Sequence, residues 1–312
     1  MANPRILFMG TPEFSLPALR LLHERSYPIV GVVTQPDRPK GRGLKEIAPP
    51  VKELAGELRL PVFQPDRVKD PSFLELLRKL KPDMIVVVAF GQILPKAVID
   101  FPPLKCLNIH PSLLPKYRGA APMNWAIING EKKTGITIML MDEGMDSGDI
   151  LLQKETDIGP SETFGELHDR LASEGARLLV ETIEQVIAQT VSRKPQDAAL
   201  ATFAPRITKE TATINWKNKA SDIVNLIRGL SPAPAAYTFW EGRNLKIFQA
   251  VARTGKVNQA PGTIGAAEEA GLPVAATDGY VILRDVQLAG KKRMPIADFL
   301  RGHPMEPGSV LT

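Results

Sequence analysis

The sequence predicts an α/β protein in which a Rossmann-like, doubly wound and mostly parallel sheet is followed by a small, mostly β, OB-like barrel. Apolar runs alternate with amphipathic stretches through the first two thirds of the chain, as the strands and helices of such a sheet do. Several of these runs are continuously apolar, which is typical of strands buried on both faces. The last third carries short β-like segments separated by turn signals such as Glu241-Gly242 and Asp278-Gly279, which favour a barrel.

The elements of the large sheet follow from the residue pattern. The predicted strands are the apolar runs 5–9, 29–34, 84–90, 106–110 and 135–141. The predicted helices are the stretches 12–24, 50–60 and 71–80, with a long helical pattern over 161–190 closing the domain. Such sheets bind ligands beyond the carboxyl ends of their strands, so the polar residues that end the strand 106–110 are the first candidates for a site.

The chain is predicted to change character after residue 190. Residues 191–207 lack periodicity and are expected to link a first domain, 1–190, to a second, 208–312. The second domain begins with a short helix pattern over 221–230, followed by β-like segments at 237–240, 244–252, 262–264 and 279–286.

Charge is distributed unevenly between these two parts. Lys and Arg balance Asp and Glu, 25 against 25, over residues 1–205, but exceed them, 14 against 9, over residues 206–312. A basic module attached to a neutral one favours a polyanionic partner such as nucleic acid, and a solvated basic surface that binds nothing is the alternative interpretation.

Composition restricts the class of protein. With 312 residues, 44% of them hydrophobic, the chain can bury a substantial core. No apolar run approaches bilayer length, and the start MANPRILFMG lacks the order of a signal peptide, so we expect a soluble, cytoplasmic protein without membrane association. Cys106 is the only cysteine, which excludes an internal disulfide and a cysteine zinc cluster. The stretch GTPEF at 10–14 lacks the G-x-G-x-x-G spacing, so nothing supports NAD binding.

Asn108 and His110 end the predicted strand 106–110. Side chains at i and i+2 of a strand share one face, so the two are expected to project together. An amide that can donate, beside an imidazole that can donate or accept, suits acyl transfer to an amine, because one group polarises the carbonyl and the other handles a proton. A structural histidine that caps a strand end is the alternative for this pair alone.

The Gly-rich acidic loop MDEGMDSGDI, at 141–150, follows another predicted strand. A carboxylate there could orient the histidine, as the third member of a catalytic triad does. The acidic spacing does not match a calcium loop, and Gln153 stands where the closing glutamate of such a loop would lie. An acidic surface turn is the remaining alternative.

The loop TQPDRPKGRGLK, at 34–45, is rich in basic residues. Its basic residues, set against the single acid Asp37, are Arg38, Lys40, Arg42 and Lys45. Glycines flank Arg42, so we expect a mobile cationic tip that could close on phosphates. An ordinary solvated loop is the alternative.

Taken together, these motifs resemble those of the methionyl-tRNA formyltransferases. The resemblance runs nearly end to end and rests on MGTPEF (9–14), TQPDRPKGRG (34–43), VVVAFGQILPKAV (86–98), LNIHPSLLPKYRGAAP (107–122), TGITIMLMDEGMDSGDIL (134–151) and PGT (261–263). It implies transfer of a formyl group from 10-formyltetrahydrofolate to the α-amine of methionyl initiator tRNA. No metal is implied because the formyl donor is already activated, and no obligate protein partner is inferred.

The resemblance also assigns residues to roles. The catalytic trio would be Asn108, His110 and Asp146, with the first two stabilising an oxyanion, His110 also assisting proton transfer, and Asp146 orienting the imidazole. The folate cosubstrate would contact two segments, which comprise Phe90, Gly91, Gln92, Ile93 and Leu94 in the first, and Ser112, Leu113, Leu114 and Pro115 in the second. Transfer RNA would meet the basic loop through Arg42 and its neighbours, and the C-terminal domain through Lys291, Lys292 and Arg293.

Other functions share parts of this pattern. A glycinamide ribonucleotide formyltransferase would keep the N-x-H…D trio but generally lacks a second, basic domain. A sugar-nucleotide formyltransferase or a formyltetrahydrofolate hydrolase would keep the trio as well, without accounting for the basic loop. An RNA-binding module whose α/β domain only senses folate has no evident need for three polar groups at one strand end.

Overall fold

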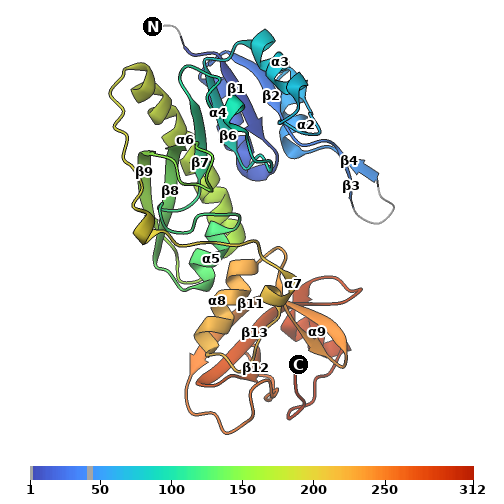
Figure 1. The fold of residues 1–312 in the computed structure, drawn as a ribbon. Coiled ribbons are helices and arrows are strands. Elements are labelled where there is room, and N and C mark those ends of the chain that lie inside the picture. Colours follow the sequence, from blue (N-terminus) through green and yellow to red (C-terminus); the bar gives the residue numbers. More distant parts are fainter. Residues whose placement is uncertain (1–2, 41–44) are drawn as a thin grey trace. The chain divides into compact units, whose positions relative to one another are not determined.

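The computed structural model describes residues 3–40 and 45–312 (Figure 1). Grouped by contacts, the chain forms two compact units. The first contains the described residues as far as Gly119, together with Thr134–Thr156 and His168–Phe203. The second contains Ala120–Lys133, Asp157–Leu167 and Ala204–Thr312. This grouping differs from the expected division into continuous segments, because residues 191–203 group with the first unit and two earlier segments with the second.

The first unit is built on a seven-stranded sheet with the order β5-β2-β1-β6-β7-β8-β9. Its strands are β1 (Ile6–Gly10), β2 (Ile29–Val33), β5 (Val62–Phe63), β6 (Met84–Val88), β7 (Cys106–His110), β8 (Lys133–Leu140) and β9 (Ile150–Asp157). The pairs that join β5, β2, β1, β6 and β7 are parallel, whereas β8 is antiparallel to β7. The predicted, mostly parallel sheet is confirmed, and β7 has the predicted bounds.

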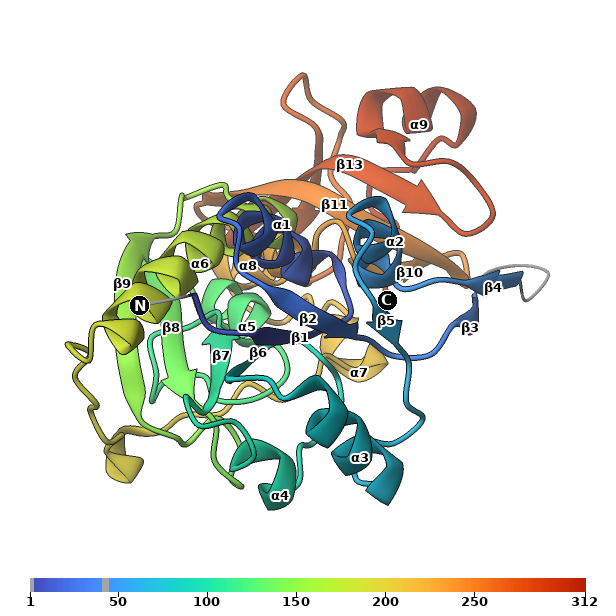
Figure 2. The same cartoon turned by 90° about the horizontal axis from the view of Figure 1, so that it is seen from above.

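Helices cover both faces of this sheet, as Figure 2 shows for α1 and α6 on one side and α3 and α4 on the other. They are the short η1 (Glu13–Ser15), α1 (Leu16–Glu24), α2 (Pro50–Glu57), α3 (Pro71–Leu80), α4 (Lys96–Ile99) and α6 (Phe164–Ile187). Gly175 of α6 lies against Ile109 of β7, since a Cβ on this glycine would come within 2.9 Å of Ile109 Cγ2. Because side chains alternate along a strand, Asn108 and His110 point to the opposite face from α6.

The second unit contains the predicted barrel. Its antiparallel strands are β10 (Ala236–Trp240), β11 (Arg243–Thr254), β12 (Leu272–Ala275), β13 (Gly279–Leu288) and β14 (Met294–Pro295), in the order β10-β11-β13-β12 with β14 beside β13. Two short segments close the ring by backbone hydrogen bonds. Residues 262–265 pair with β12 on one side, through Ala275 N to Thr263 O at 2.9 Å, and with residues 308–312 on the other, through Leu311 N to Gly262 O at 2.9 Å. Thr312 then completes the circle by exchanging hydrogen bonds of 2.7 and 3.0 Å with Phe239 of β10.

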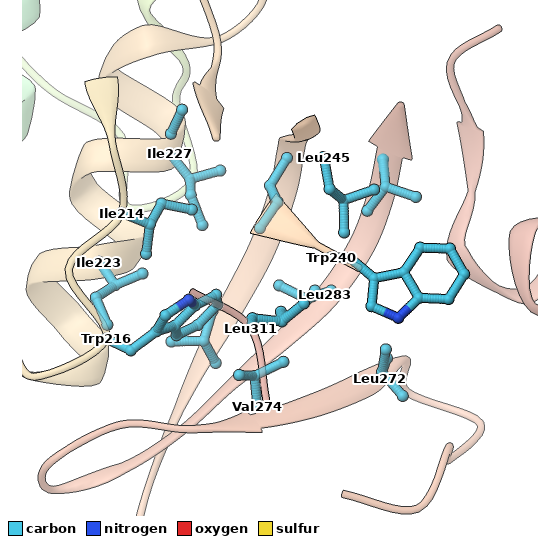
Figure 3. Close-up of a cluster of buried hydrophobic side chains, with 14 of the residues drawn as sticks. Ile214, Trp216, Ile223, Ile227, Trp240, Leu245, Leu272, Val274, Leu283 and Leu311 are labelled. Atoms are coloured by element: carbon cyan, nitrogen blue, oxygen red, sulfur yellow. The ribbon is translucent and has the colours of Figure 1, made fainter. Parts of the chain in front are cut away.

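A hydrophobic core fills this barrel, and Figure 3 shows part of it. Ile223 and Ile227 of α8 (Ala220–Leu230) contribute to the same buried cluster as Leu245 and Leu283 of the strands. The indole of Trp216 is also buried, and its Nε1 donates a 3.0 Å hydrogen bond to Thr238 Oγ1. The barrel therefore has an apolar interior in which the indole N–H of Trp216 is satisfied.

Several elements were not expected from the sequence. These are β5, β9, β12, β14, the hairpin of β3 (Arg38–Lys40) and β4 (Lys45–Ile47), α4, α5 (Pro122–Ile128), α7 (Lys209–Ala212), α9 (Ile296–Gly302) and η2 (Ala198–Leu200). Within residues 3–40 and 45–312, no helix has the length and apolar character needed to cross a membrane.

Candidate active site

His110 is the last residue of β7, and its side chain is almost completely buried, with 4% exposed. Nε2 lies 3.0 Å from the backbone oxygen of Tyr117, and Nδ1 lies 3.6 Å from Oδ2 of Asp146. A neutral imidazole has one N–H, so it can donate to only one of these oxygens at a time. The structure therefore joins two of the three predicted catalytic residues around one ring.

Asp146 reaches His110 because its loop turns back along the sheet. β8 is antiparallel to β7 and ends at Leu140, opposite Leu107, so the chain leaves β8 near the beginning of β7. The turn includes Asp146 itself, whose φ of 51° is in the left-handed region. Gly119 N–H donates a 2.8 Å hydrogen bond to Oδ2 of Asp146 and fixes the carboxylate from the other side.

Asn108 is partly exposed on the face of β7 that also carries His110. Among the described residues its side-chain amide has no hydrogen-bond partner, so it can bind a ligand oxygen. Cys106, two residues earlier on the same face, is fully buried, and burial raises the pKa of its thiol from 9.0 to about 12. This thiol packs in the core, as predicted, while the end of the strand carries the polar pair.

The segment Ser112–Pro115, predicted to contact folate, is held beside His110 by Thr137. The buried Thr137 hydroxyl donates to Ser112 O at 2.7 Å and accepts from Leu114 N at 3.2 Å. Gln153 Nε2 donates both to this hydroxyl and to Leu114 O, at 2.9 Å each. Leu113 and Pro115 are partly exposed, whereas the other two side chains of the segment are buried.

The second segment predicted to contact folate, 90–94, is an irregular stretch after β6. Its ends are anchored by the buried side chains of Phe90 and Leu94, and Phe90 O accepts hydrogen bonds from Thr11 Oγ1 at 2.8 Å and Gln35 Nε2 at 3.2 Å. Ile93 between them is 89% exposed. No described residue accepts a hydrogen bond from the backbone N–H groups of positions 91–94, which leaves them available to a ligand.

Gln92 has a different role within that segment. Its Oε1 accepts from Val68 N at 3.0 Å, and its Nε2 donates to Asp66 O at 3.2 Å. The side chain is thus committed to the protein, so only the backbone of Gln92 is free to meet a ligand.

The basic loop predicted to bind tRNA is only partly described. Arg38 is exposed on β3, and the backbone of Lys40 pairs with that of Lys45 across the hairpin. Arg42 lies outside the described residues. Asp37, the acid of this loop, accepts from Gln64 Nε2 at 2.7 Å and from Lys52 Nζ at 2.6 Å, and these hydrogen bonds lower the pKa of its carboxyl.

The basic residues predicted in the barrel fall into two kinds. Lys291 and Lys292 are exposed, and no described residue pairs with their ammonium groups. Arg293 instead forms an ion pair with Asp285 at 2.7 Å, and its guanidinium lies over the ring of Phe248, 4.3 Å from the centroid. Arg293 thus has partners within the barrel, whereas the ammonium groups of the two lysines have none among the described residues.

Sequence reasoning missed several residues that build this site. Tyr117 and Gly119 act through their backbones, and Arg118 and Gln196 form hydrogen bonds to each other behind Asp146. The Arg-Gly step in YRGAAP was a visible signal for the first three. Gln196 lies in the stretch predicted to be a linker, where no periodicity marks it. In the described part of the chain, no group of His, Cys, Asp and Glu residues is arranged to hold a metal ion.

Comparison with known proteins gives the family. The Formyl transferase family matches residues 4–183, and the Formyl transferase C-terminal domain matches residues 206–304. The methionyl-tRNA formyltransferase of Syntrophus aciditrophicus is 57% identical over 311 residues, covering 100% of both chains. That of Geobacter sulfurreducens is 48% identical, covering 100% of this chain and 98% of the relative.

Solved structures share the fold. The methionyl-tRNA formyltransferase from Clostridium thermocellum superposes with a TM-score of 0.58 at 18% identity, covering 91% of this chain and 98% of its own. HypX from Aquifex aeolicus in complex with tetrahydrofolic acid superposes with a TM-score of 0.66 at 19% identity, covering 100% of this chain and 51% of its own. On the full-length identity to the curated relatives and the match to both domains, the chain belongs to the methionyl-tRNA formyltransferase family.

Proposed function

We propose that this protein transfers the formyl group of 10-formyltetrahydrofolate to the α-amino group of methionyl initiator tRNA, in the cytoplasm. The observation that carries the proposal is the buried imidazole of His110, which ends β7 with Asp146 3.6 Å from its Nδ1 and the unpartnered amide of Asn108 two residues away. Acyl transfer to an amine needs these groups together. The names of the relatives support the substrates.

The formyl donor is proposed to lie against the segments 90–94 and 112–115. A flat heterocycle with donor and acceptor atoms along its edge suits the unpartnered backbone N–H groups of positions 91–94, and the exposed side chain of Ile93 offers it an apolar contact. HypX was solved with tetrahydrofolic acid, and the sugar formyltransferase WlaRD with 5-N-formyl-THF. These complexes agree with a folate-type donor, and the 10-formyl form is what the resemblance to the family implies.

The proposed chemistry forms one carbon–nitrogen bond and breaks another. The methionyl nitrogen attacks the formyl carbon, and the Asn108 amide donates to the oxygen as it becomes an oxyanion. The bond from the formyl carbon to N10 then breaks, one proton leaves the attacking nitrogen, and N10 gains one. His110 carries this proton through Nε2, so no net proton is gained or lost by the protein.

Asp146 decides which ring nitrogen of His110 can act. Nε2 faces a carbonyl, which only accepts, so in a neutral ring Nε2 carries the single hydrogen. Proton uptake at Nε2 needs the other tautomer, in which Nδ1–H donates to a carboxylate. Asp146 stands beside Nδ1 for this purpose, and the proposed cycle therefore releases Nε2 from Tyr117 O when the substrates bind.

Transfer RNA is proposed to bind two basic surfaces. The first is the 34–45 loop, which contains Arg38, Lys40, Arg42 and Lys45, and whose one acid, Asp37, is paired with Lys52. The second is the barrel, where Lys291, Lys292 and Arg293 are all exposed, the first two without an ion-pair partner among the described residues. Contacts of this kind bind phosphates and make affinity depend on salt.

The experiment is a comparison of acceptors at fixed 10-formyltetrahydrofolate. Methionyl initiator tRNA, free methionine, glycinamide ribonucleotide and a nucleotide-linked amino sugar are supplied in parallel, with His110→Ala as the control. The proposal predicts rapid formylation of the tRNA that is lost in the variant. Transfer only to a small amine would retain the formyl chemistry and overturn the tRNA assignment, and no transfer to any acceptor would overturn both.

A further inference from the structure

The side-chain amide of Gln196 uses all of its hydrogen-bonding positions next to the candidate site. Its Oε1 accepts from Nε and Nη2 of Arg118, at 3.1 and 2.8 Å. Its Nε2 donates to the backbone oxygens of Asp146, at 2.9 Å, and Gly148, at 2.8 Å. A glutamine amide offers two N–H donors and one oxygen with two lone pairs, so every position is occupied.

Gln196 holds the part of the loop that has an unfavourable backbone conformation. Asp146 has a φ of 51°, a conformation that a residue with a Cβ adopts rarely. Such a conformation persists when the surrounding structure fixes it. Gly119 N–H fixes the carboxylate of Asp146, and Gln196 fixes the main chain on either side of the turn.

Arg118 anchors Gln196 from behind. Its side chain is buried, with 8% of the residue exposed, and among the described residues its guanidinium hydrogen-bonds to Gln196 alone. A hydrogen bond from a charged donor is shorter and stronger than a neutral one, and it polarises the amide that receives it. Both N–H groups of Gln196 are therefore better donors than they would be without Arg118.

We propose that Gln196, anchored by Arg118, is a positioning residue for the transfer reaction. It holds residues 146–148 so that the carboxylate of Asp146 faces Nδ1 of His110, and it touches neither substrate. The inference rests on the proposed function, because it assigns Gln196 to the histidine–carboxylate pair of that reaction. It places a determinant of catalysis in the stretch that the sequence indicated to be a linker.

Replacing Gln196 by glutamate separates its hydrogen bonds with Arg118 from its hydrogen bonds with the loop. Glutamate at position 196 would keep both hydrogen bonds from Arg118, and would strengthen them by its charge. It would have no N–H for the oxygens of Asp146 and Gly148, and its second carboxylate oxygen would repel them. Gln196→Glu therefore removes the hydrogen bonds to the loop while it retains those from Arg118.

The test is a double-mutant cycle on the full chain, with formyl transfer from 10-formyltetrahydrofolate to methionyl initiator tRNA as the assay. Gln196→Glu is expected to lower kcat by roughly 10-fold to 100-fold, the effect of a small displacement of a catalytic group, with the KM of both substrates unchanged. In the background of Asp146→Asn, the same change is expected to cause no further loss, because Gln196 acts through Asp146. Gln189→Glu, at an exposed position, is the matched control and should behave as wild type.

Each possible result of this double-mutant cycle leads to a different conclusion. If the losses of Gln196→Glu and Asp146→Asn multiply in the double variant, or if Gln196→Glu keeps the wild-type kcat, the positioning role is wrong. If Gln196→Glu does not fold, as judged by its thermal transition, Gln196→Ala takes its place in the same cycle with the same expectation. If wild type and Gln189→Glu themselves form no formylated tRNA, the proposed function fails, which no result at position 196 can imitate.

Discussion

Nε2 of His110 lies 3.0 Å from the backbone oxygen of Tyr117 and must donate to it, since a carbonyl oxygen only accepts. In a neutral ring the single hydrogen is therefore on the nitrogen away from Asp146. For the proposed reaction to occur, the ring has to exchange this tautomer for the one that Asp146 stabilises. The distance between His110 and Asp146 is thus the part of the site on which turnover should depend most strongly.

Asp146→Asn is predicted to lower kcat by about 10²-fold to 10⁴-fold, because an amide cannot stabilise the protonated ring. The fold should be retained, since the amide oxygen of asparagine can still accept from Gly119 N–H. Steady-state formylation and a thermal melt measure both effects. Glu143→Gln, in the exposed part of the same loop, is the control that should keep its activity. Wild-type turnover by the Asn variant would remove Asp146 from the mechanism.

Thr137→Val is predicted to destabilise the protein by about 1–3 kcal/mol, because it leaves buried partners of a hydroxyl unsatisfied. This hydroxyl bonds Ser112 O, Leu114 N and Gln153 Nε2. Thr182→Val is the matched control, since Thr182 is equally buried but only donates to Leu178 O within its own helix. Equal losses in the two variants, measured by urea unfolding, would contradict the special role of Thr137.

Lys292→Gln and Arg293→Gln are predicted to affect different properties. The lysine variant should keep its stability but bind tRNA more weakly, with a salt dependence reduced by about one phosphate contact. The arginine variant should lose about 1 kcal/mol of stability, because Arg293 pairs with Asp285 and stacks on Phe248. Tm and tRNA affinity over a range of salt concentrations distinguish them. A lysine variant with unchanged affinity and salt dependence would exclude Lys292 from the tRNA surface.

The thiol of Cys106 is predicted to be inert in the folded protein. Its pKa is raised from 9.0 to about 12, mainly by burial, so at neutral pH it stays protonated and shielded from reagents. Ellman's reagent should therefore label the protein only as it unfolds in denaturant. Rapid labelling of the native protein would show that the strand β7 opens.

The raised pKa of Cys106 also affects the stability of the fold at high pH. The unfolded thiol ionises from about pH 9 upward, while the folded thiol stays protonated, so the unfolded state binds fewer protons. The contribution of Cys106 is complete below pH 9 and is lost as the pH rises toward 12. Cys106→Ala should show a smaller loss of unfolding free energy than wild type over this window, and parallel losses would contradict the shift.

The sequence predicted β7 and its polar pair because the information is local. The apolar run 106–110 and the i, i+2 spacing of Asn108 and His110 are enough to place both side chains on one face. The direction of β8 could not be predicted in this way, because an apolar run looks the same in a parallel and in an antiparallel strand. The way in which Asp146 reaches His110 depends on that direction, and on a left-handed residue that no pattern marks.

Residues that act through hydrogen bonds outside regular helices and strands were also beyond prediction. Gln196 has no periodic neighbours, so its stretch looked like a linker, although Lys194 pairs with Ile150 of β9 at 2.9 Å in both directions. The segment 308–312 is similar, because it is too short to have a strand pattern and is held by its partners, whereas its neighbour 262–264 was predicted as a β-like segment. Their order comes from long-range contacts, which a local reading of the sequence does not contain.

The closure of the barrel by Thr312 and Phe239 has a consequence for biosynthesis. While the chain is still growing, residues 308–312 remain inside the ribosome after the rest of the second unit has been made, so the ring stays open until they emerge. The first unit has no such requirement and can fold earlier, since domains fold as units during synthesis. Until then, the edge of β10 that Phe239 presents is unpaired, and a strand of another chain could pair with it.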